Sequence, residues 1–367
     1  MSLRLRFSES DWERIGRDWP AWWAGELDRP LVVLECIERQ DRYDLHYASV
    51  FLGNYPLDMP ANELLNEFVP RLENTHYLGD SFPRFWPNFG PGIVAAFAGA
   101  QVHPAWDTTW FTPGQPGPVA DLRVGSDWQS PWWRRVYEIT QAAVNRWGRE
   151  LAVGFTDLGG NLDVLASLRD TRQLLIDLVK SPQEIDRLVG ETTRLWLACY
   201  DRLYASIASA GGGITCWGPC WSKGRGYMLQ SDFSYMISPK MFERFVLPDL
   251  EACCAVMDYA FYHLDGKGQL VHVEPLLSIP RLRGIQWVPG YGKPPCEEWL
   301  PLLKKIRAAG KLCQVTVSPE GALTIIRELG GKGFAFVIDE PQLTPGQGQA
   351  FLEELGDRFL HNSINIP

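Results

Sequence analysis

The sequence predicts an α/β protein, and a closed (β/α)8 TIM barrel is the architecture that it favours. From residue 150 onward, short apolar runs alternate with amphipathic helical patterns, as in a parallel sheet covered by helices. Two strand-like runs in the first 100 residues bring the count to about eight or nine strands, enough to close a barrel. An open doubly wound sheet is the alternative. The sequence has neither a Gly-x-Gly-x-x-Gly fingerprint after its first strand nor a Walker-type Gly-Lys-Ser/Thr.

The first 150 residues are irregular and rich in Trp, Pro and Gly. Apolar periodicity predicts strands at 31–35 and 93–98, and helices at 8–18, 61–75 and 132–149. We expect one barrel domain over the whole chain. Its parts are an irregular Trp-rich N-terminal extension or lid (1–90), the barrel (91–345) and a C-terminal helix and tail (346–367).

The rest of the chain shows a regular order of strands and helices. The apolar runs that predict strands are 151–155, 214–217, 227–230, 259–263, 285–288, 312–317 and 334–338. Helix starts carry a capping Ser followed by a Pro at the first helical position, at Ser181-Pro182, Ser238-Pro239 and Ser318-Pro319. Gly310 ends a predicted helix at 296–309, as glycine does at many helix C-termini.

Composition limits the classes of function. The chain of 367 residues carries 35 Lys and Arg against 44 Asp and Glu, and this net charge of -9 is unsuited to a broad nucleic-acid surface. No apolar run approaches the roughly 20 residues that span a bilayer. The N-terminus lacks the apolar segment of a signal peptide and the eight Cys form no secreted disulfide pattern, so we expect a reduced, cytoplasmic protein. The 16 Trp predict an aromatic core or a concave site.

A barrel enzyme places its chemistry at the ends of its strands, and one predicted strand end carries a His and an Asp. His263 and Asp265 close the strand at 259–263 and are two residues apart, so both point to the same side of the sheet. The pair suits a divalent metal or a general acid and base. The structural alternative is a His that ends the strand and is oriented by the Asp, without chemistry.

Other predicted strand ends supply acids that can orient a substrate and aromatic rings that can wall it. The candidate substrate-binding residues are Asp157, Trp217, Trp221, Asp232, Tyr235 and Trp287. Asp339 follows the last strand and joins His263 and Asp265 as a candidate catalytic residue. The alternative for this strand end is that Glu340-Pro341 simply caps the next helix. Cys216 and Cys220 flank a Gly-Pro turn, where buried thiols are favoured over metal ligands.

Three segments carry motifs of a known family. The segment at 231–248 places Ser-Pro-x-x-Phe-x-x-Phe-x-x-Pro after an Asp-containing strand end, the segment at 262–266 reads Tyr-His-Leu-Asp-Gly, and 165–182 leads into a Ser-Pro helix start. In order and spacing, over about residues 150–340, they resemble the uroporphyrinogen decarboxylase superfamily. The segment at 262–266 is similar to the His-x-Cys-Gly of its corrinoid-linked methyltransferases. The resemblance implies an enzyme on a barrel scaffold, and a homodimer.

Departures from this superfamily change what the resemblance implies. Its Arg-rich signature is only echoed at 39–43, and its Gly-His-Gly is replaced at 337–339 by Val-Ile-Asp, which argues against true uroporphyrinogen decarboxylation. Its zinc methyltransferases bind the metal with a His and two Cys. Here Asp265 and Asp339 stand for the two Cys. The implied set of His263, Asp265 and Asp339 would hold a divalent metal such as zinc and suit an oxygen-bearing substrate.

The expected function is therefore an enzyme like uroporphyrinogen decarboxylase that acts on a small cyclic or aromatic molecule, by decarboxylation (a lyase) or by methyl transfer. One alternative is a metal-dependent methyltransferase with a separate corrinoid protein as its partner. Another is a barrel that binds a sugar or an aromatic ligand without chemistry, since indole rings suit sugar faces. We expect neither a nucleic acid nor a membrane as a partner.

Overall fold

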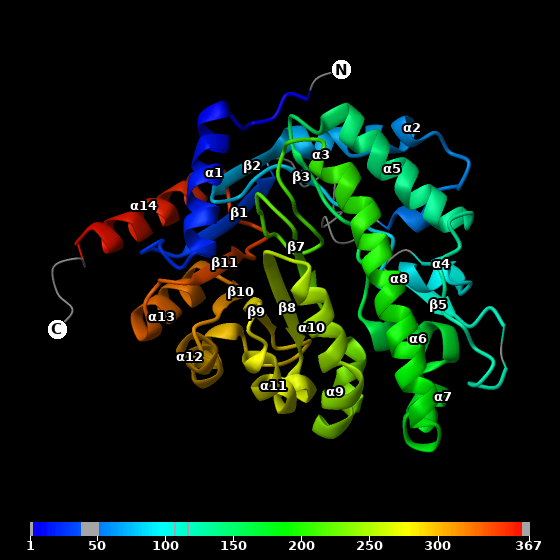
Figure 1. The fold of residues 1–367 in the computed structure, drawn as a ribbon. Helices are drawn as coiled ribbons and strands as arrows, with labels where there is room; N and C mark the ends of the chain where they lie inside the picture. The colour runs from blue at the N-terminus through cyan, green and yellow to red at the C-terminus, as the bar shows by residue number, and fades with distance from the viewer. Residues whose placement is uncertain (1–2, 38–50, 106–107, 116, 362–367) are drawn as a thin grey trace. The chain divides into compact units, whose positions relative to one another are not determined.

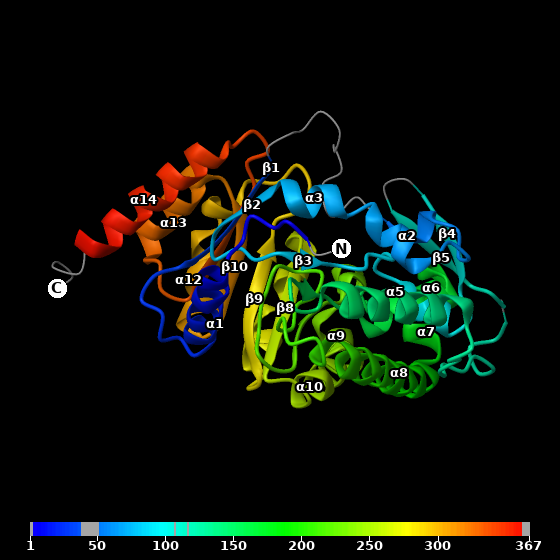
Figure 2. The same ribbon diagram turned by 90° about the horizontal axis from the view of Figure 1, so that it is seen from above.

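The computed structural model describes residues 3–37, 51–105, 108–115 and 117–361 (Figure 1). The chain divides into two compact units: Met1–Asp44, Val69–Pro83 and Arg283–Pro367 form the first, and Leu45–Phe68 and Arg84–Leu282 form the second. Helices alternate with strands that are mostly parallel, which confirms the α/β class (Figure 1, Figure 2). None of the helices in these ranges is both long enough and apolar enough to cross a membrane.

The first unit contains a sheet with its strands in the order β2-β1-β11-β10-β9. Its parallel strands are β1 (Leu31–Ile37), β9 (Leu282–Val288), β10 (Leu312–Val317) and β11 (Phe334–Ile338). The fifth strand, β2 (Thr75–Gly79), runs antiparallel to β1. β10 and β11 have the predicted bounds. Nearly every residue in them is buried, because a parallel strand is covered on both faces.

The helices of this unit are α1 (Glu9–Trp23), α3 (Val69–Asn74), α12 (Leu300–Ala308), α13 (Pro319–Leu329) and α14 (Pro345–His361), and η5 (Cys296–Glu298) is a 3-10 turn. Ser318 caps α13 as the Ser-Pro pattern predicts, because its side chain accepts the N–H of Gly321 at 3.1 Å. The helix predicted at 296–309 is divided into η5 and α12.

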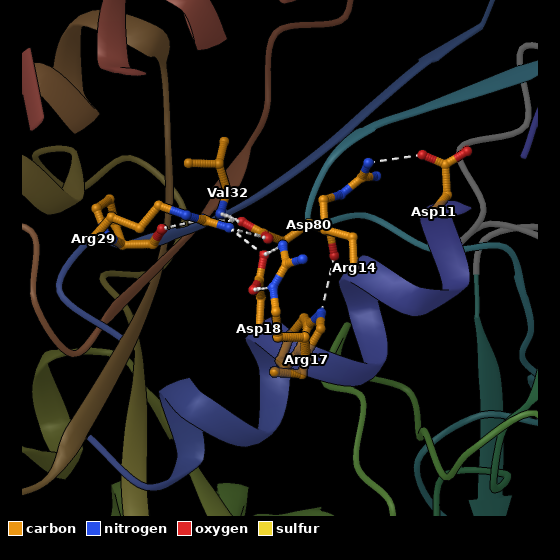
Figure 3. Close-up of polar contacts among 9 residues, drawn as sticks. Asp11, Arg14, Arg17, Asp18, Arg29, Val32 and Asp80 are labelled. Carbon is orange, nitrogen blue, oxygen red and sulfur yellow. Dashed lines mark hydrogen bonds and ion pairs between the residues drawn. The ribbon is translucent and has the colours of Figure 1, made fainter. Parts of the chain in front are cut away.

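An ion-pair network ties α1 to the first two strands of this unit (Figure 3). Arg29 donates to both carboxylate oxygens of Asp80, at 2.7 and 2.8 Å, and to Asp18 at 2.8 Å. The carboxylate of Asp80 also accepts the N–H of Val32 at 2.8 Å. The backbone carbonyl of Asp80 accepts the indole N–H of Trp19 at 3.0 Å. The N-terminal helix is therefore fixed to the sheet by paired charges as well as by its buried indole rings.

The second unit contains short strands in pairs. β3 (Arg84–Phe85) with β6 (Ala152–Val153) and β7 (Gly226–Leu229) with β8 (Tyr259–Asp265) are parallel, and β4 (Gln101–Pro104) with β5 (Thr109–Thr112) is an antiparallel hairpin. Its α-helices are α2 (Ala61–Asn66), α4 (Ile93–Phe97), α5 (Pro131–Trp147), α6 (Asn161–Arg169), α7 (Thr171–Lys180), α8 (Pro182–Ala208), α9 (Pro239–Phe245), α10 (Leu247–Ala255) and α11 (Val273–Ser278). Its 3-10 turns are η2 (Leu52–Asn54), η3 (Asp232–Met236) and η4 (Lys267–His272).

Some predicted elements differ from the structure. The strand predicted at 93–98 is wrong, because this segment forms the buried helix α4; a short apolar run does not reveal its period. The helix predicted at 61–75 is divided into α2 and α3. At 214–217 there are isolated bridges rather than a strand. The pairings among the described strands form no closed ring, so the predicted closure of the barrel is not found in them.

The core of the second unit is aromatic. The ring of Phe155 stacks on Tyr200 with 4.7 Å between centroids, and Trp196 and Tyr227 pack around them. The hydroxyl of Tyr227 accepts the N–H of Leu158 at 2.7 Å. This cluster fixes the chain before α6 against β7, and both segments lead to the site described next.

Candidate cation site at the end of strand β8

Two neighbouring parallel strands of the second unit, β7 and β8, end at the same edge. Leu229 pairs with Tyr262, so the chain just beyond β7 lies beside the end of β8. His263 and Asp265 belong to the last residues of β8, and Asp232 begins the turn η3 that follows β7. Because parallel strands present their carboxyl ends together, these three side chains converge.

The converging groups have the composition of a cation site. One ring nitrogen of His263 and one carboxylate oxygen each from Asp232 and Asp265 all lie within 4.8 Å of one another. His263 and Asp265 are half-buried and Asp232 is exposed, so a small solute can reach the group. Gly266 follows with a φ of 79°, a left-handed conformation that glycine adopts without strain, and turns the chain after Asp265. Imidazole and carboxylate donors in such a group can bind a divalent cation.

Electrostatics favour a positive charge here. The side chain of Asp232 reaches solvent, yet protein surrounds it on most sides. This loss of solvation, followed by the charges of Asp265 and Asp157, raises the pKa of Asp232 to about 7. A bound cation would offset the repulsion between these carboxylates, so the arrangement is suited to attract one.

Asp157 is a buried acid whose charge acts on Asp232. Its carboxylate accepts the N–H of Gly159 at 2.9 Å. Burial, followed among the raising causes by the charge of Asp163, raises the pKa of Asp157 to about 7. Asp157 therefore acts on Asp232 through its charge, and its orientation toward a substrate stays a prediction.

Two of the predicted aromatic walls lie beside the candidate ligands. The indole of Trp217 meets the ring of His263 edge-on, with 4.9 Å between centroids and 88° between planes, and donates to the carbonyl of Met228 at 3.1 Å. Tyr235 belongs to η3, like Asp232, and is 54% exposed. Its ring lies so close to Gly268 that a Cβ there would be 2.6 Å from two ring carbons.

The remaining predicted residues have other surroundings. Trp221 is buried and donates its indole N–H to the carbonyl of Gly212 at 2.9 Å. Its burial and this hydrogen bond are those of a structural residue. Trp287 and Asp339 belong to the first unit. Trp287 is wholly buried and packs edge-on against Trp299, whereas Asp339 is exposed at the end of β11. The grouping of Asp339 with the ligands of the second unit stays a prediction.

Thiolate ligation is disfavoured by the state of the cysteines. All eight Cys are buried, including Cys216 and Cys220, as the sequence predicts. Burial raises the pKa of Cys216 to about 11, so this thiol is neutral near pH 7. The donors that do converge are an imidazole and two carboxylates. Such a set suits a harder cation and an oxygen-bearing substrate.

Two polar residues beside the site carry little sequence signal. Asp163 lies in the first turn of α6, where acids commonly serve the helix dipole. His272 ends η4, is fully buried, and hydrogen-bonds through Nε2 to the carbonyl of Ser234 at 2.9 Å. The usable signal was Gly159-Gly160 before α6, because paired glycines permit a close approach of backbone. The segment 39–43, which echoes the Arg-rich signature, lies outside the described residues.

Comparisons with known proteins give one kind of match. No protein-family model and no curated protein matches the sequence. A solved structure of a methyltransferase from Methanosarcina mazei is similar over 93% of this chain and 97% of its own, with a TM-score of 0.59 and 15% sequence identity. The two chains share a fold. At this identity the likeness concerns the fold alone, and methyl transfer is the activity named for the other protein.

Proposed function

We propose that the chain is a cation-dependent methyltransferase that acts on a small, oxygen-bearing cyclic or aromatic molecule. The observation that carries this proposal is the group of one imidazole nitrogen and two carboxylate oxygens within 4.8 Å at the end of β8. The shared fold with a methyltransferase, over most of both chains, supports methyl transfer over decarboxylation. The family resemblance at 262–266 supports the same branch.

The residues of the site divide the work by their chemistry. Asp232, His263 and Asp265 would bind the cation, and when bound it would supply a Lewis acid that polarises a substrate oxygen. Trp217 would hold the edge of the His263 ring and offer an apolar wall, and Tyr235 would offer a second ring to a cyclic substrate. The zinc methyltransferases of the superfamily use Cys ligands and activate a thiol substrate. Because this chain has carboxylates in the corresponding role, we expect the methyl group to move to or from oxygen. A corrinoid protein as methyl carrier stays a prediction from the sequence.

Cation binding is the first test. The full-length chain, stripped with a chelator, is titrated with Zn²⁺ and Mn²⁺ by calorimetry, and bound metal is counted by elemental analysis. We expect about one cation per chain, with affinity reduced more than about tenfold in His263→Ala and Asp265→Asn. His103→Ala is the matched control, because His103 is exposed on the β4–β5 hairpin, where its ring bonds to the hydroxyl of Thr112. A wild-type chain that binds neither metal contradicts the proposal.

Activity is the second test. Labelled methyl transfer is measured between free corrinoid and a panel of methoxylated and hydroxylated aromatic acids, with and without the cation. We expect transfer that requires the cation and is lost in His263→Ala. Release of CO2 from the panel without methyl transfer would favour a decarboxylase instead. Binding of a panel member without turnover, unchanged in His263→Ala, would favour a barrel that only binds its ligand.

A further inference from the structure

We infer that Asp163, on α6, is the positioning residue that holds Asp232 in the cation site. The inference rests on the proposed function, because it concerns the proposed cation site. Asp163 itself contacts neither the substrate nor the cation in this inference. Its role is to fix the backbone of η3, the turn that carries Asp232, at the place where the side chain meets His263 and Asp265.

The carboxylate of Asp163 accepts three backbone N–H groups. One oxygen accepts the N–H of Phe233 at 2.6 Å, and the other accepts the N–H of Asp232 at 3.0 Å and the N–H of Gly160 at 3.2 Å. Two of these donors are consecutive residues of η3, and one is the N–H of the candidate ligand itself. The bonds join residues about 70 positions apart, so they fix the turn against α6 rather than only capping the helix.

The neighbouring backbone confirms how closely the two segments approach. A Cβ on Gly160 would lie 2.4 Å from the carbonyl oxygen of Gln230 and 2.5 Å from a carboxylate oxygen of Asp163. Real Cβ atoms do not approach other atoms so closely, so only glycine fits between the start of α6 and the chain beyond β7. Gly160 thus lets the Asp163 carboxylate reach the N–H groups of η3.

The middle of η3, at Ser234, is held separately. His272 lies opposite the carbonyl of Ser234 at 2.9 Å, and because a carbonyl can only accept, Nε2 carries the proton. The hydroxyls of Ser231 and Ser234 are 2.7 Å apart, and the ring of His272 stacks on Phe242 at 4.4 Å. Loss of the Asp163 bonds would therefore release the first residues of η3, which include Asp232, while the turn as a whole stays anchored.

The experiment compares two aspartates of the second unit, Asp163 and Asp249. In Asp163→Asn, one oxygen is replaced by an NH2 group that cannot accept from backbone N–H groups. In the control Asp249→Asn, the altered side chain lies on α10 and bonds to Thr193 rather than to the backbone of η3. We measure Zn²⁺ affinity by calorimetry, the thermal midpoint, and amide hydrogen exchange at 232 and 233. We expect Asp163→Asn to speed exchange at both amides and to lower the affinity 10- to 100-fold, as expected when a residue that orients a metal ligand is lost.

The outcomes separate the inference from the proposed function. If Asp163→Asn binds Zn²⁺ like the control and its two amides keep their protection, the inference is overturned. If the wild-type chain binds no Zn²⁺ but exchange at 232 and 233 still rises in Asp163→Asn, the role of Asp163 in fixing η3 is supported and the proposed cation site is contradicted. Should Asp163→Asn not fold, Asp163→Glu keeps a carboxylate on a longer stem. An intermediate affinity and intermediate exchange support the inference, and wild-type values of both overturn it.

Discussion

Asp249 shows how a single buried acid links this fold to pH. It is 6% exposed on α10, where the hydroxyl of Thr193 donates to it. Burial, with a further contribution from the charge of Asp163, raises the pKa of Asp249 from 3.8 to about 7. The folded state therefore binds this proton more tightly than the unfolded state between about pH 4 and pH 7. The stability that Asp249 contributes is present below pH 4 and is lost as the pH rises toward 7.

Asp249→Asn should remove this part of the pH dependence. An amide side chain can still accept from Thr193 and has no charge to bury. We expect the free energy of unfolding to fall less between pH 5 and pH 8 in the variant than in the wild type. The difference should be on the order of 1–3 kcal/mol and favour the variant at pH 8. Urea titrations at the two pH values measure it, and equal slopes for both proteins would refute the assignment.

The residues of the candidate site can be predicted from the sequence to different degrees. His263 and Asp265 could be paired because strand side chains alternate, and the structure places both at the end of β8. For Asp232 the sequence predicts only that it orients a substrate, because its approach to His263 and Asp265 depends on the register of β7 against β8. Asp163 carries little sequence signal. Two of its three bonds join segments about 70 positions apart in the chain, and no local pattern encodes that contact.

Elements were predictable where local chemistry and burial agree. β10 and β11 are apolar runs rich in β-branched and aromatic residues between polar boundaries, and both have the predicted bounds. The segment Ile93–Phe97 is as apolar but carries two alanines and follows Pro91 and Gly92, and it forms a helix. Burial on all sides hides the period that would tell the two structures apart.

Glycine substitutions test the packing around η3. Gly160→Ala would press a methyl group onto the backbone of 230–231, with the carbonyl oxygen of Gln230 at 2.4 Å and Cα of Ser231 at 3.0 Å. Backbone on both sides cannot yield without moving α6 or η3. We expect a loss of about 2 kcal/mol in unfolding free energy and weaker Zn²⁺ binding.

Gly268→Ala is the matched comparison for Gly160→Ala. The atoms nearest its methyl group would be those of the Tyr235 ring, at 2.6 Å, and this side chain is 54% exposed, so it has solvent to rotate into. We expect a loss below about 1 kcal/mol and Zn²⁺ binding near that of the wild type. Urea denaturation and calorimetry give both quantities. Equal losses in the two alanine variants would show that the backbone of 230–231 has room to move.

At the scale of the whole molecule, composition predicts an aromatic core or a concave site, but not where the indole rings lie. Trp19 and Trp22 are wholly buried in the first unit, and Trp217 lies against His263 in the second. The alternation of strands and helices correctly indicates a mostly parallel sheet, because each strand and each helix is encoded by its local sequence pattern. Closure of a barrel and the division of the chain into two units depend on pairings between distant segments. Counting strands could not supply them.

Arg29 tests how far the first unit depends on charge. Asp18 and Asp80 are 5% and 1% exposed, and Arg29 bonds to both. Arg29→Met would leave two buried carboxylates without this cation. We expect a loss of about 2 kcal/mol in unfolding free energy, since Arg29 keeps about a third of its side chain in solvent and part of its effect is screened.

Arg17→Ala is the control for Arg29→Met, because Arg17 bonds to Asp18 from a side chain that is 70% exposed, and it should cost less than about 0.5 kcal/mol. Urea denaturation compares the two variants, and equal losses would mean that the buried carboxylates find other partners. The ligands Asp232, His263 and Asp265 all belong to the second unit. Folded Arg29→Met should therefore still bind Zn²⁺ with the wild-type stoichiometry. If Arg29→Met lost Zn²⁺ binding as well as stability, the result would show that the cation site needs the intact first unit.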